Sequence, residues 1–151
     1  MDSEAKDLIS SLENVKKGMK NSLNEVPQEA LNWNPLPGDA NSIFAMVTHF
    51  CGSEGFWIRQ VVGGTNIGRN RDSEFLAKGN SKEDLLALLD KTQESSAQAI
   101  DKASAEGLDR TVTSPNFGEM SARAAILHTI EHGFTHLGHV QLTKQWWEQK
   151  G

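Results

Sequence analysis

Four of the five histidines lie in one short stretch near the C-terminus, LHTIEHGFTHLGHV. His128, His132 and His136 recur every four residues, and His139 follows three residues later. Side chains three and four positions apart share one face of a helix, so these imidazoles should form a stripe along it. Neutral imidazoles are good ligands for divalent transition metals. The spacing therefore predicts a metal site, which the remaining histidine, His49, would complete from a second helix.

Helix geometry limits how many of these histidines can bind one ion. Two histidines four residues apart can point their ring nitrogens at the same cation, at about 2.0–2.1 Å for zinc. A further helical turn lies too far along the axis, so only two adjacent members of the series His128, His132 and His136 can bind directly. Three imidazoles suit zinc, nickel, iron or copper without choosing among them. The alternative is that the histidines form a solvated face, or are satisfied by neighbouring side chains.

The motif differs from the HExxH of zinc peptidases. Gly133 occupies the position of the catalytic glutamate, and Glu131 precedes His132 instead of following it. A peptidase is therefore disfavoured. Gly133 and Gly138 each cost a helix about 1 kcal/mol relative to alanine. They either allow close approach of another helix or a ligand, or are simply tolerated small residues.

Composition narrows the class of protein. A chain of 151 residues is expected to form one domain, over residues 1–151. The net charge of −5 and the lack of a Lys/Arg-rich block argue against a nucleic-acid partner. We expect no membrane association, because no apolar run approaches the roughly 18–20 residues that span a bilayer. A single cysteine, Cys51, and no signal sequence predict a cytoplasmic protein.

Hydrophobic periodicity predicts an all-α four-helix bundle. The expected helices cover residues 3 to about 24, 43–62, 81 to about 106, and 121 to about 149. Ser81 and Ser121 should cap the last two helices, and Gly107 should end the third. The long connections, 26–41 and 63–80, permit one crossover, with short helical turns expected at 28–31 and 74–78. No strand is expected, because TVTSPN is too short and ends in a proline.

The periodicity also orients the candidate ligands. His49 lies at the margin of the apolar stripe of the second predicted helix, whereas Cys51 is about 200° around the helix from it. Cys51 should therefore not share a metal with His49. In the fourth predicted helix, the histidine stripe lies about 90–180° from the main apolar stripe. That apolar stripe consists of Leu127, Ile130, Phe134 and Leu137. Trp33, in the first long connection, is expected to pack on the bundle.

Two segments carry a resemblance to a known family, LNWNPLPGDANSIFAMVTHF and ILHTIEHGFTHLGHVQL. They combine a Trp-x-Pro entry, a Ser-Ile helix start, a lone histidine one-third along that helix, and a late H-x-x-x-H-x-G. In order and spacing, over residues 8–148, the chain resembles the DinB/YfiT-like superfamily of metal-binding four-helix bundles. The resemblance implies that His49 is the lone ligand of the second helix and that His132 and His136 are the paired ligands. His128 matches a position that is often histidine but usually not a ligand.

Two positions depart from that family pattern. Both affect the polar lining that is expected in the pocket beside the metal site. Gly133 stands where the family often has Glu, and His139 stands where it often has Gln. His128 and His139 are therefore assigned to the pocket lining or to supporting the ligands. Arg69 and Arg71, together with Arg59, could hold carboxylates of a substrate, although a solvated surface position is the alternative for each.

The resemblance implies a thiol-dependent chemistry. The superfamily includes thiol-dependent S-transferases and a mycothiol-dependent isomerase. The leading hypothesis is a metal-dependent S-transferase that activates a small-molecule thiol toward an electrophilic substrate. The alternative is a non-enzymatic, stress-related bundle that binds a metal or a small ligand. The resemblance also leads us to expect a homodimer.

Overall fold

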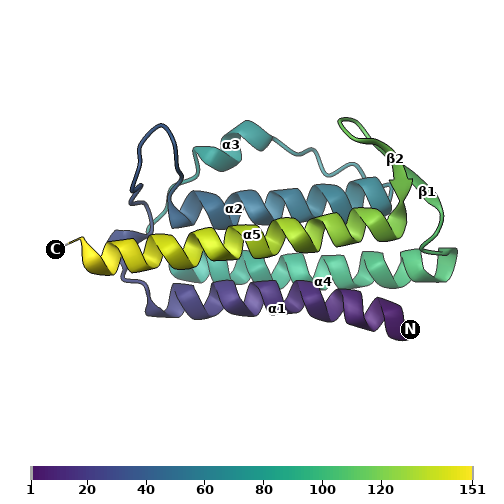
Figure 1. Cartoon of the computed structure of the whole chain (residues 1–151), viewed down its shortest axis with the longest axis horizontal. Coiled ribbons are helices and arrows are strands. Elements are labelled where there is room, and N and C mark those ends of the chain that lie inside the picture. Colours follow the sequence, from purple (N-terminus) through teal and green to yellow (C-terminus); the bar gives the residue numbers. More distant parts are fainter. Residues whose placement is uncertain (1, 151) are drawn as a thin grey trace.

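Four long helices run side by side in the computed structural model, which describes residues 2–150 (Figure 1). They are α1 (Ser3–Glu25), α2 (Ile43–Glu54), α4 (Lys82–Glu106) and α5 (Ala122–Gln149). α2 continues as a π-helical segment, η2 (Gly55–Val62), which brings the second helix to the predicted length. Shorter elements are η1 (Gln28–Ala30), α3 (Arg71–Phe75), β1 (Thr111–Ser114) and β2 (Gly118–Ser121). The predicted all-α bundle is confirmed.

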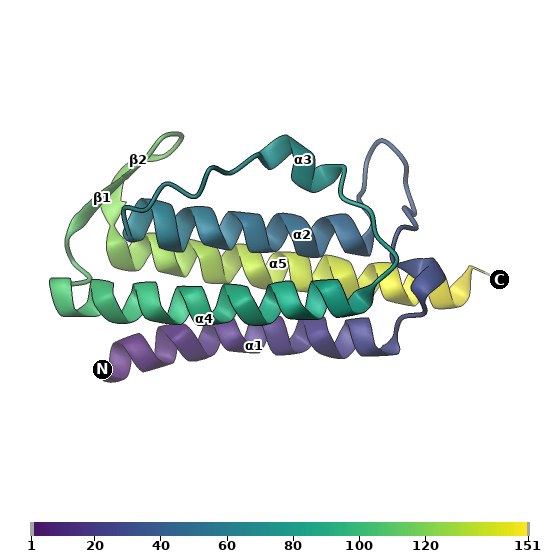
Figure 2. The same cartoon turned by 180° about the vertical axis from the view of Figure 1, so that it is seen from behind.

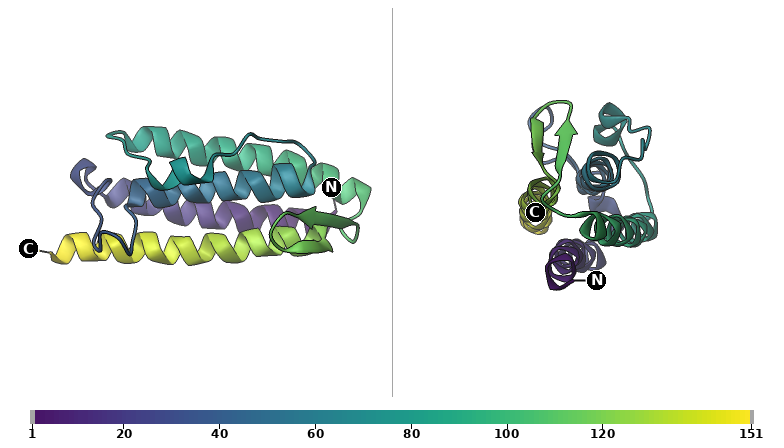
Figure 3. Two further views of the ribbon diagram at one scale, coloured as in Figure 1. Left: turned by 90° about the horizontal axis from the view of Figure 1, so that it is seen from above. Right: turned by 90° about the vertical axis from the view of Figure 1, so that its right-hand side faces the viewer.

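The helices follow an up-down-down-up order. α1 and α5 run in one direction, and α2 and α4 run in the other (Figures 1 and 2). α1 packs against α4 and α5, and α2 packs against the same two helices from the other side. α2 and α4 can be parallel because residues 63–81, hereafter the crossover, return along the outside of α2 (Figure 2). The crossover carries α3, and an end-on view shows α3 and the β1–β2 hairpin on the same side of the bundle (Figure 3).

Side-chain caps define the starts of three helices, and two of the caps, Ser81 and Ser121, are those that the sequence predicts. The hydroxyls of Ser42, Ser81 and Ser121 accept hydrogen bonds from the third residue of α2, α4 and α5. Each bond satisfies an amide that has no partner within its own helix. α4 ends at Gly107, whose φ of 103° is a conformation that favours glycine.

The expectation that no strand forms was wrong. β1 and β2 pair as a short antiparallel hairpin, with Thr111 opposite Ser121 and Ser114 opposite Gly118. Pro115 lies in the turn, outside both strands, so it does not interrupt the ladder. The short helix of the crossover also lies earlier than expected, at 71–75 instead of 74–78, because the Asn70 side chain caps it.

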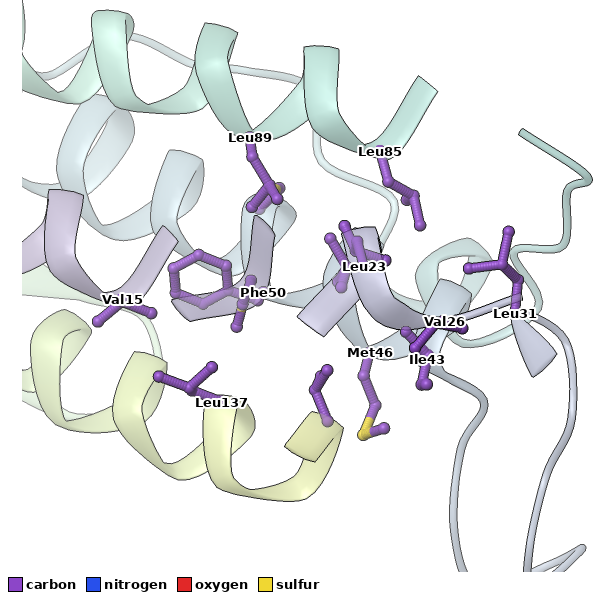
Figure 4. Close-up of a cluster of buried hydrophobic side chains, with 14 of the residues drawn as sticks. Val15, Leu23, Val26, Leu31, Ile43, Met46, Phe50, Leu85, Leu89 and Leu137 are labelled. Atoms are coloured by element: carbon purple, nitrogen blue, oxygen red, sulfur yellow. The ribbon is translucent and has the colours of Figure 1, made fainter. Parts of the chain in front are cut away.

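Buried hydrophobic side chains form two clusters, one toward each end of the bundle. In the first, Val15, Phe50, Leu89 and Leu137 come from four different helices (Figure 4). The second is built in the same way from Leu12, Ile58, Ile100 and Ile126. Trp33 packs against the end of α5, with its ring 5.6 Å from that of Trp147, as expected from the sequence. No helix in residues 2–150 has the length and apolar content needed to cross a membrane.

The buried face of α5 differs from its main apolar stripe. Leu127 and Phe134 are exposed, whereas the buried positions are mostly small. They are Ala122, Ala125, Ile126, Thr129, Gly133, Leu137, Val140 and Thr143. A Cβ at Gly133 would lie 2.9 Å from the Phe50 ring, so glycine allows α5 to pack closely against α2. Gly138 faces open space and is the tolerated small residue of the pair.

A buried ion pair lies where the two clusters meet. Lys16 of α1 and Glu54 of α2 are almost fully buried, and the ammonium nitrogen lies 2.7 Å from Oε2 of the carboxylate. The ammonium also donates to the Gln93 side chain at 2.7 Å, and Ser96 donates to Glu54 at 2.7 Å. Burial lowers the pKa of Lys16 and raises the pKa of Glu54, while their mutual attraction opposes both changes. This polar layer links α1, α2 and α4 inside the core.

We predict that Lys16→Met lowers the free energy of unfolding by about 3–5 kcal/mol, because Glu54 is left buried without its counter-charge. Adding Glu54→Leu should recover part of the loss, since no charge then stays buried. Lys20→Met is the matched control, because Lys20 pairs with the exposed Asp90 and should cost less than about 1 kcal/mol. Urea denaturation at pH 7 measures all three variants. A Lys16→Met loss no larger than that of the control would contradict the prediction.

Candidate metal centre

Three histidines from two helices converge between α2 and α5. His49 comes from α2, and His132 and His136 come from successive turns of α5. Each offers one ring nitrogen, and these three atoms lie within 4.8 Å of one another. The Nε2 atoms of His132 and His136 are 3.0 Å apart. The structure therefore brings together the three residues that the sequence nominates as ligands.

A buried carboxylate orients His49. Nδ1 of His49 lies 3.0 Å from Oε1 of Glu74, which belongs to α3. Arg69 holds the same carboxylate through two bonds of 2.8 Å, from Nε to Oε2 and from Nη2 to Oε1. A carboxylate bonded to one ring nitrogen fixes the imidazole and makes the other nitrogen a better ligand. Nε2 of His49 is thus the nitrogen available to a cation.

The position of Glu74 depends on close packing against α2. A Cβ at Gly52 would lie only 1.9 Å from Oε2 of Glu74, so any larger residue would displace the carboxylate. On the neighbouring face, the His49 ring stacks on Phe75, with ring centroids 4.5 Å apart. The crossover therefore holds His49 through both a hydrogen bond and ring packing.

All three imidazoles are held in the neutral form. Burial lowers the pKa of His132 to about 3, and the neighbouring His136 and His49 add to this effect. Burial also lowers the pKa of His136 to about 4, again with a contribution from His49. For His49 itself, burial lowers the pKa while the bond to Glu74 opposes the change. Since metals bind neutral imidazole, no proton has to be displaced at neutral pH.

The donor set fits a divalent transition metal. Two nitrogens on a tetrahedral zinc ion lie about 3.3 Å apart, close to the 3.0 Å that separates Nε2 of His132 from Nε2 of His136. Without a cation, two neutral rings at that distance can form only one hydrogen bond, in which one Nε2 donates and the other accepts. A cation, in contrast, could accept the lone pairs of both Nε2 atoms. Both Nδ1 atoms are buried with no hydrogen-bond partner among residues 2–150. Three protein ligands also leave positions open, as in catalytic zinc sites.

A cavity of about 400 Å³ opens beside the histidines, hereafter the histidine cavity. His49 and His132 form part of its wall, so a bound molecule would reach the candidate ligands. The aromatic part of the lining is Phe56, Trp57 and Phe117. The polar part is Ser53, Arg69, Arg71, Ser114, Asn116 and His128. The volume matches that of a small-molecule site, and the lining is more polar than is typical of such sites.

Three of the predicted pocket residues do line this cavity. His128 is held against the aromatic wall, with its ring 4.6 Å from that of Trp57. Arg69 is committed to Glu74, as described above. Arg71 is exposed and has its guanidinium 4.9 Å from the Phe75 ring centroid. Arg71 forms no ion pair within residues 2–150, so its whole guanidinium is free for a ligand.

Three other residues lie away from it. His139 is exposed, with its ring 5.6 Å from that of His136, and is not part of the lining. Arg59 faces a different cavity between α2 and α4. Cys51 is buried, and burial raises the pKa of its thiol to about 12. Cys51 therefore stays protonated at neutral pH and does not join the ligand group.

Sequence reasoning missed Glu74 and the hairpin. Glu74 fell inside a predicted helical turn, but nothing in its spacing connects it to His49, 25 residues earlier. Ser114, Asn116 and Phe117 were missed because the hairpin that carries them was not expected. A search for a turn between two short β-prone segments would have found the hairpin.

We predict that Glu74→Gln weakens metal binding by about 10–100-fold, because His49 loses its charged acceptor. Asp72→Asn is the matched control, since Asp72 is an exposed acid of the same short helix. Competition with a chromogenic chelator measures zinc affinity in both variants, and circular dichroism checks that they fold. Equal affinities would show that Glu74 does not support the site.

We also predict that the metal-free protein loses stability as the pH falls from about 6.5 toward 4. The pKa of His132 drops from 6.5 in the unfolded chain to about 3 when folded, and that of His136 drops to about 4. Between these values the unfolded chain binds protons that the folded chain does not, so acid favours unfolding. The urea midpoint of unfolding, measured across this pH range, should fall less steeply with falling pH in a His132→Gln/His136→Gln variant than in the wild type. Parallel slopes would contradict the prediction.

Comparisons with known proteins agree with the fold. The family model of the DinB superfamily matches residues 11–140. A DinB-like protein from Bacillus subtilis shares the fold with a TM-score of 0.70 at 17% identity, over 95% of this chain and 92% of the other. A conserved protein from Enterococcus faecalis gives a TM-score of 0.75 at 11% identity, over 96% of both chains. No curated protein matches the chain. The family match covers most of the chain and agrees with the bundle, and the chain belongs to the DinB superfamily.

Proposed function

We propose that the chain is a metal-dependent transferase that joins a small-molecule thiol to an electrophile in the histidine cavity. The observation that carries the proposal is a group of three candidate histidine ligands, two of which, His49 and His132, line a cavity of about 400 Å³. A metal held by His49, His132 and His136 would lower the pKa of a thiol and make its sulfur nucleophilic. The sulfur then forms a bond to the electrophilic carbon, and the leaving group departs with its electron pair. The thiol proton passes to solvent.

The chain's own residues would bind and orient both substrates. Arg71 supplies a free guanidinium for a carboxylate of the thiol. Ser114 Oγ is buried and has no hydrogen-bond partner among residues 2–150, so it is available to a polar group of a ligand. Phe56, Trp57 and Phe117 offer an apolar wall for the electrophile.

The open cavity supports an enzyme over a metal-stabilised scaffold. A purely structural zinc site is normally closed by four protein ligands. Here, within residues 2–150, the grouped candidate ligands are three histidines, and no cysteine or carboxylate joins them. Glu74 is close, but it bonds to His49 and Arg69. The ligand set is therefore incomplete in the way that catalytic sites are.

We predict that protein reconstituted with zinc, nickel or iron consumes a low-molecular-weight thiol together with an electrophile such as 1-chloro-2,4-dinitrobenzene. Mass spectrometry of the thioether product measures turnover, and elemental analysis measures bound metal. His132→Ala should abolish both. Arg71→Gln should raise KM about tenfold for a carboxylated thiol but not for 2-mercaptoethanol, because a charge-assisted bond is lost.

Arg123→Gln is the control for Arg71→Gln, since Arg123 pairs with Glu4 and Asp109 away from the cavity. It should leave both KM values unchanged. Stoichiometric metal binding without consumption of any thiol would contradict the transferase while leaving the metal centre in place.

A further inference from the structure

A second cavity, of about 360 Å³, borders a different face of α2 from the histidine cavity. It lies between α2, α4 and the crossover, which are seen together in Figure 2. We call it the α2–α4 cavity. It contains none of the five histidines, so it is not part of the candidate metal centre. Arg69 is the one basic residue that lines both cavities.

The α2–α4 cavity is positively charged although the protein is acidic. Arg59 from η2, Lys91 from α4 and Arg69 from the crossover contribute basic side chains to its lining. Neither Arg59 nor Lys91 forms an ion pair within residues 2–150. Glu74 is the only acid of the lining, and it is already bound by Arg69 and His49. The cavity is therefore lined by basic side chains, Arg59 and Lys91, that no acidic residue in the described part of the chain neutralises.

Further hydrogen-bond donors line the same space. Lys91 and Ser95 are four residues apart on α4, so both lie on the face that borders the cavity. The Asn70 oxygen caps α3 by accepting from Ser73, which leaves its amide nitrogen free to donate. Arg69 binds Glu74 through Nε and Nη2, so Nη1 can donate to another acceptor without releasing Glu74.

The rest of the lining combines hydroxyl side chains, from Thr48, Ser73, Thr92 and Ser96, with an apolar part. Cys51, Ile67 and Leu88 supply the apolar part, beside Gly52 and Gly55 of the second helix. Unpaired cations and free donors next to an apolar surface suit a ligand with a charged oxygen group and a short hydrocarbon part. We propose that the α2–α4 cavity binds a small organic oxyanion, of the phosphate or carboxylate class, independently of the metal.

Calorimetric titration of the metal-free protein with inorganic phosphate and with monobutyl phosphate tests the proposal. Both probes should bind saturably at one site, and monobutyl phosphate should bind several-fold more tightly because its chain covers apolar surface. Arg59→Gln and Lys91→Gln should each weaken binding about tenfold, since each removes a charge-assisted bond. Lys91 is exposed, so its variant tests the site even if Arg59→Gln is unstable.

Two matched variants separate this site from general charge effects and from the metal centre. Lys17→Gln removes an equal charge from the exposed face of α1 and should bind both probes as the wild type does. His132→Ala should also bind them normally, because the α2–α4 cavity holds no histidine. Absence of saturable binding, unchanged affinity in Lys91→Gln, or loss of binding in His132→Ala would each overturn the proposal.

Discussion

The bonds from Glu74 to His49 and Arg69 connect the parts of this protein that matter for its chemistry. The carboxylate is buried, so it needs both partners to offset its lost hydration. Through these bonds the crossover is tied to α2, and the His49 ring is held with one nitrogen directed away from Glu74. Arg69, which bonds to Glu74, lines both the histidine cavity and the α2–α4 cavity. Removing one carboxylate would therefore disturb a ligand, a loop and two cavity walls.

The four helices supply the rigid part of the site. His132 and His136 are placed by α5, whose close approach to α2 depends on the missing side chain of Gly133. The layer formed by Lys16 and Glu54 ties α1 to α2 within the same bundle. Ligands on packed helices are held more precisely than ligands on loops. This suits a metal centre, where small displacements change the geometry of coordination.

The crossover and the hairpin add side chains to the site that the four long helices do not provide. The crossover contributes Arg69, Arg71 and Glu74, and the hairpin contributes Ser114 and Phe117. Loops carried on a rigid scaffold commonly determine what a site binds. The helices of this fold thus position the candidate metal ligands. The crossover and the hairpin supply much of the lining of the histidine cavity, whereas η2 and α4 share with the crossover the basic side chains of the α2–α4 cavity.

The sequence by itself determined the helices, their caps and the three histidines, because these depend on local spacing. A 3.6-residue period, a serine before each of three helices and histidines four apart all act within a few turns. Only the tertiary structure decided which face of α5 is buried. The small residues on that face are needed because they let the side chains of Phe50 and Val15 pack closely against the helix. The tertiary structure also decided that Glu74 serves His49 and that a hairpin borders the histidine cavity. Such pairings join residues far apart in the chain, and they arise from packing that no local pattern records.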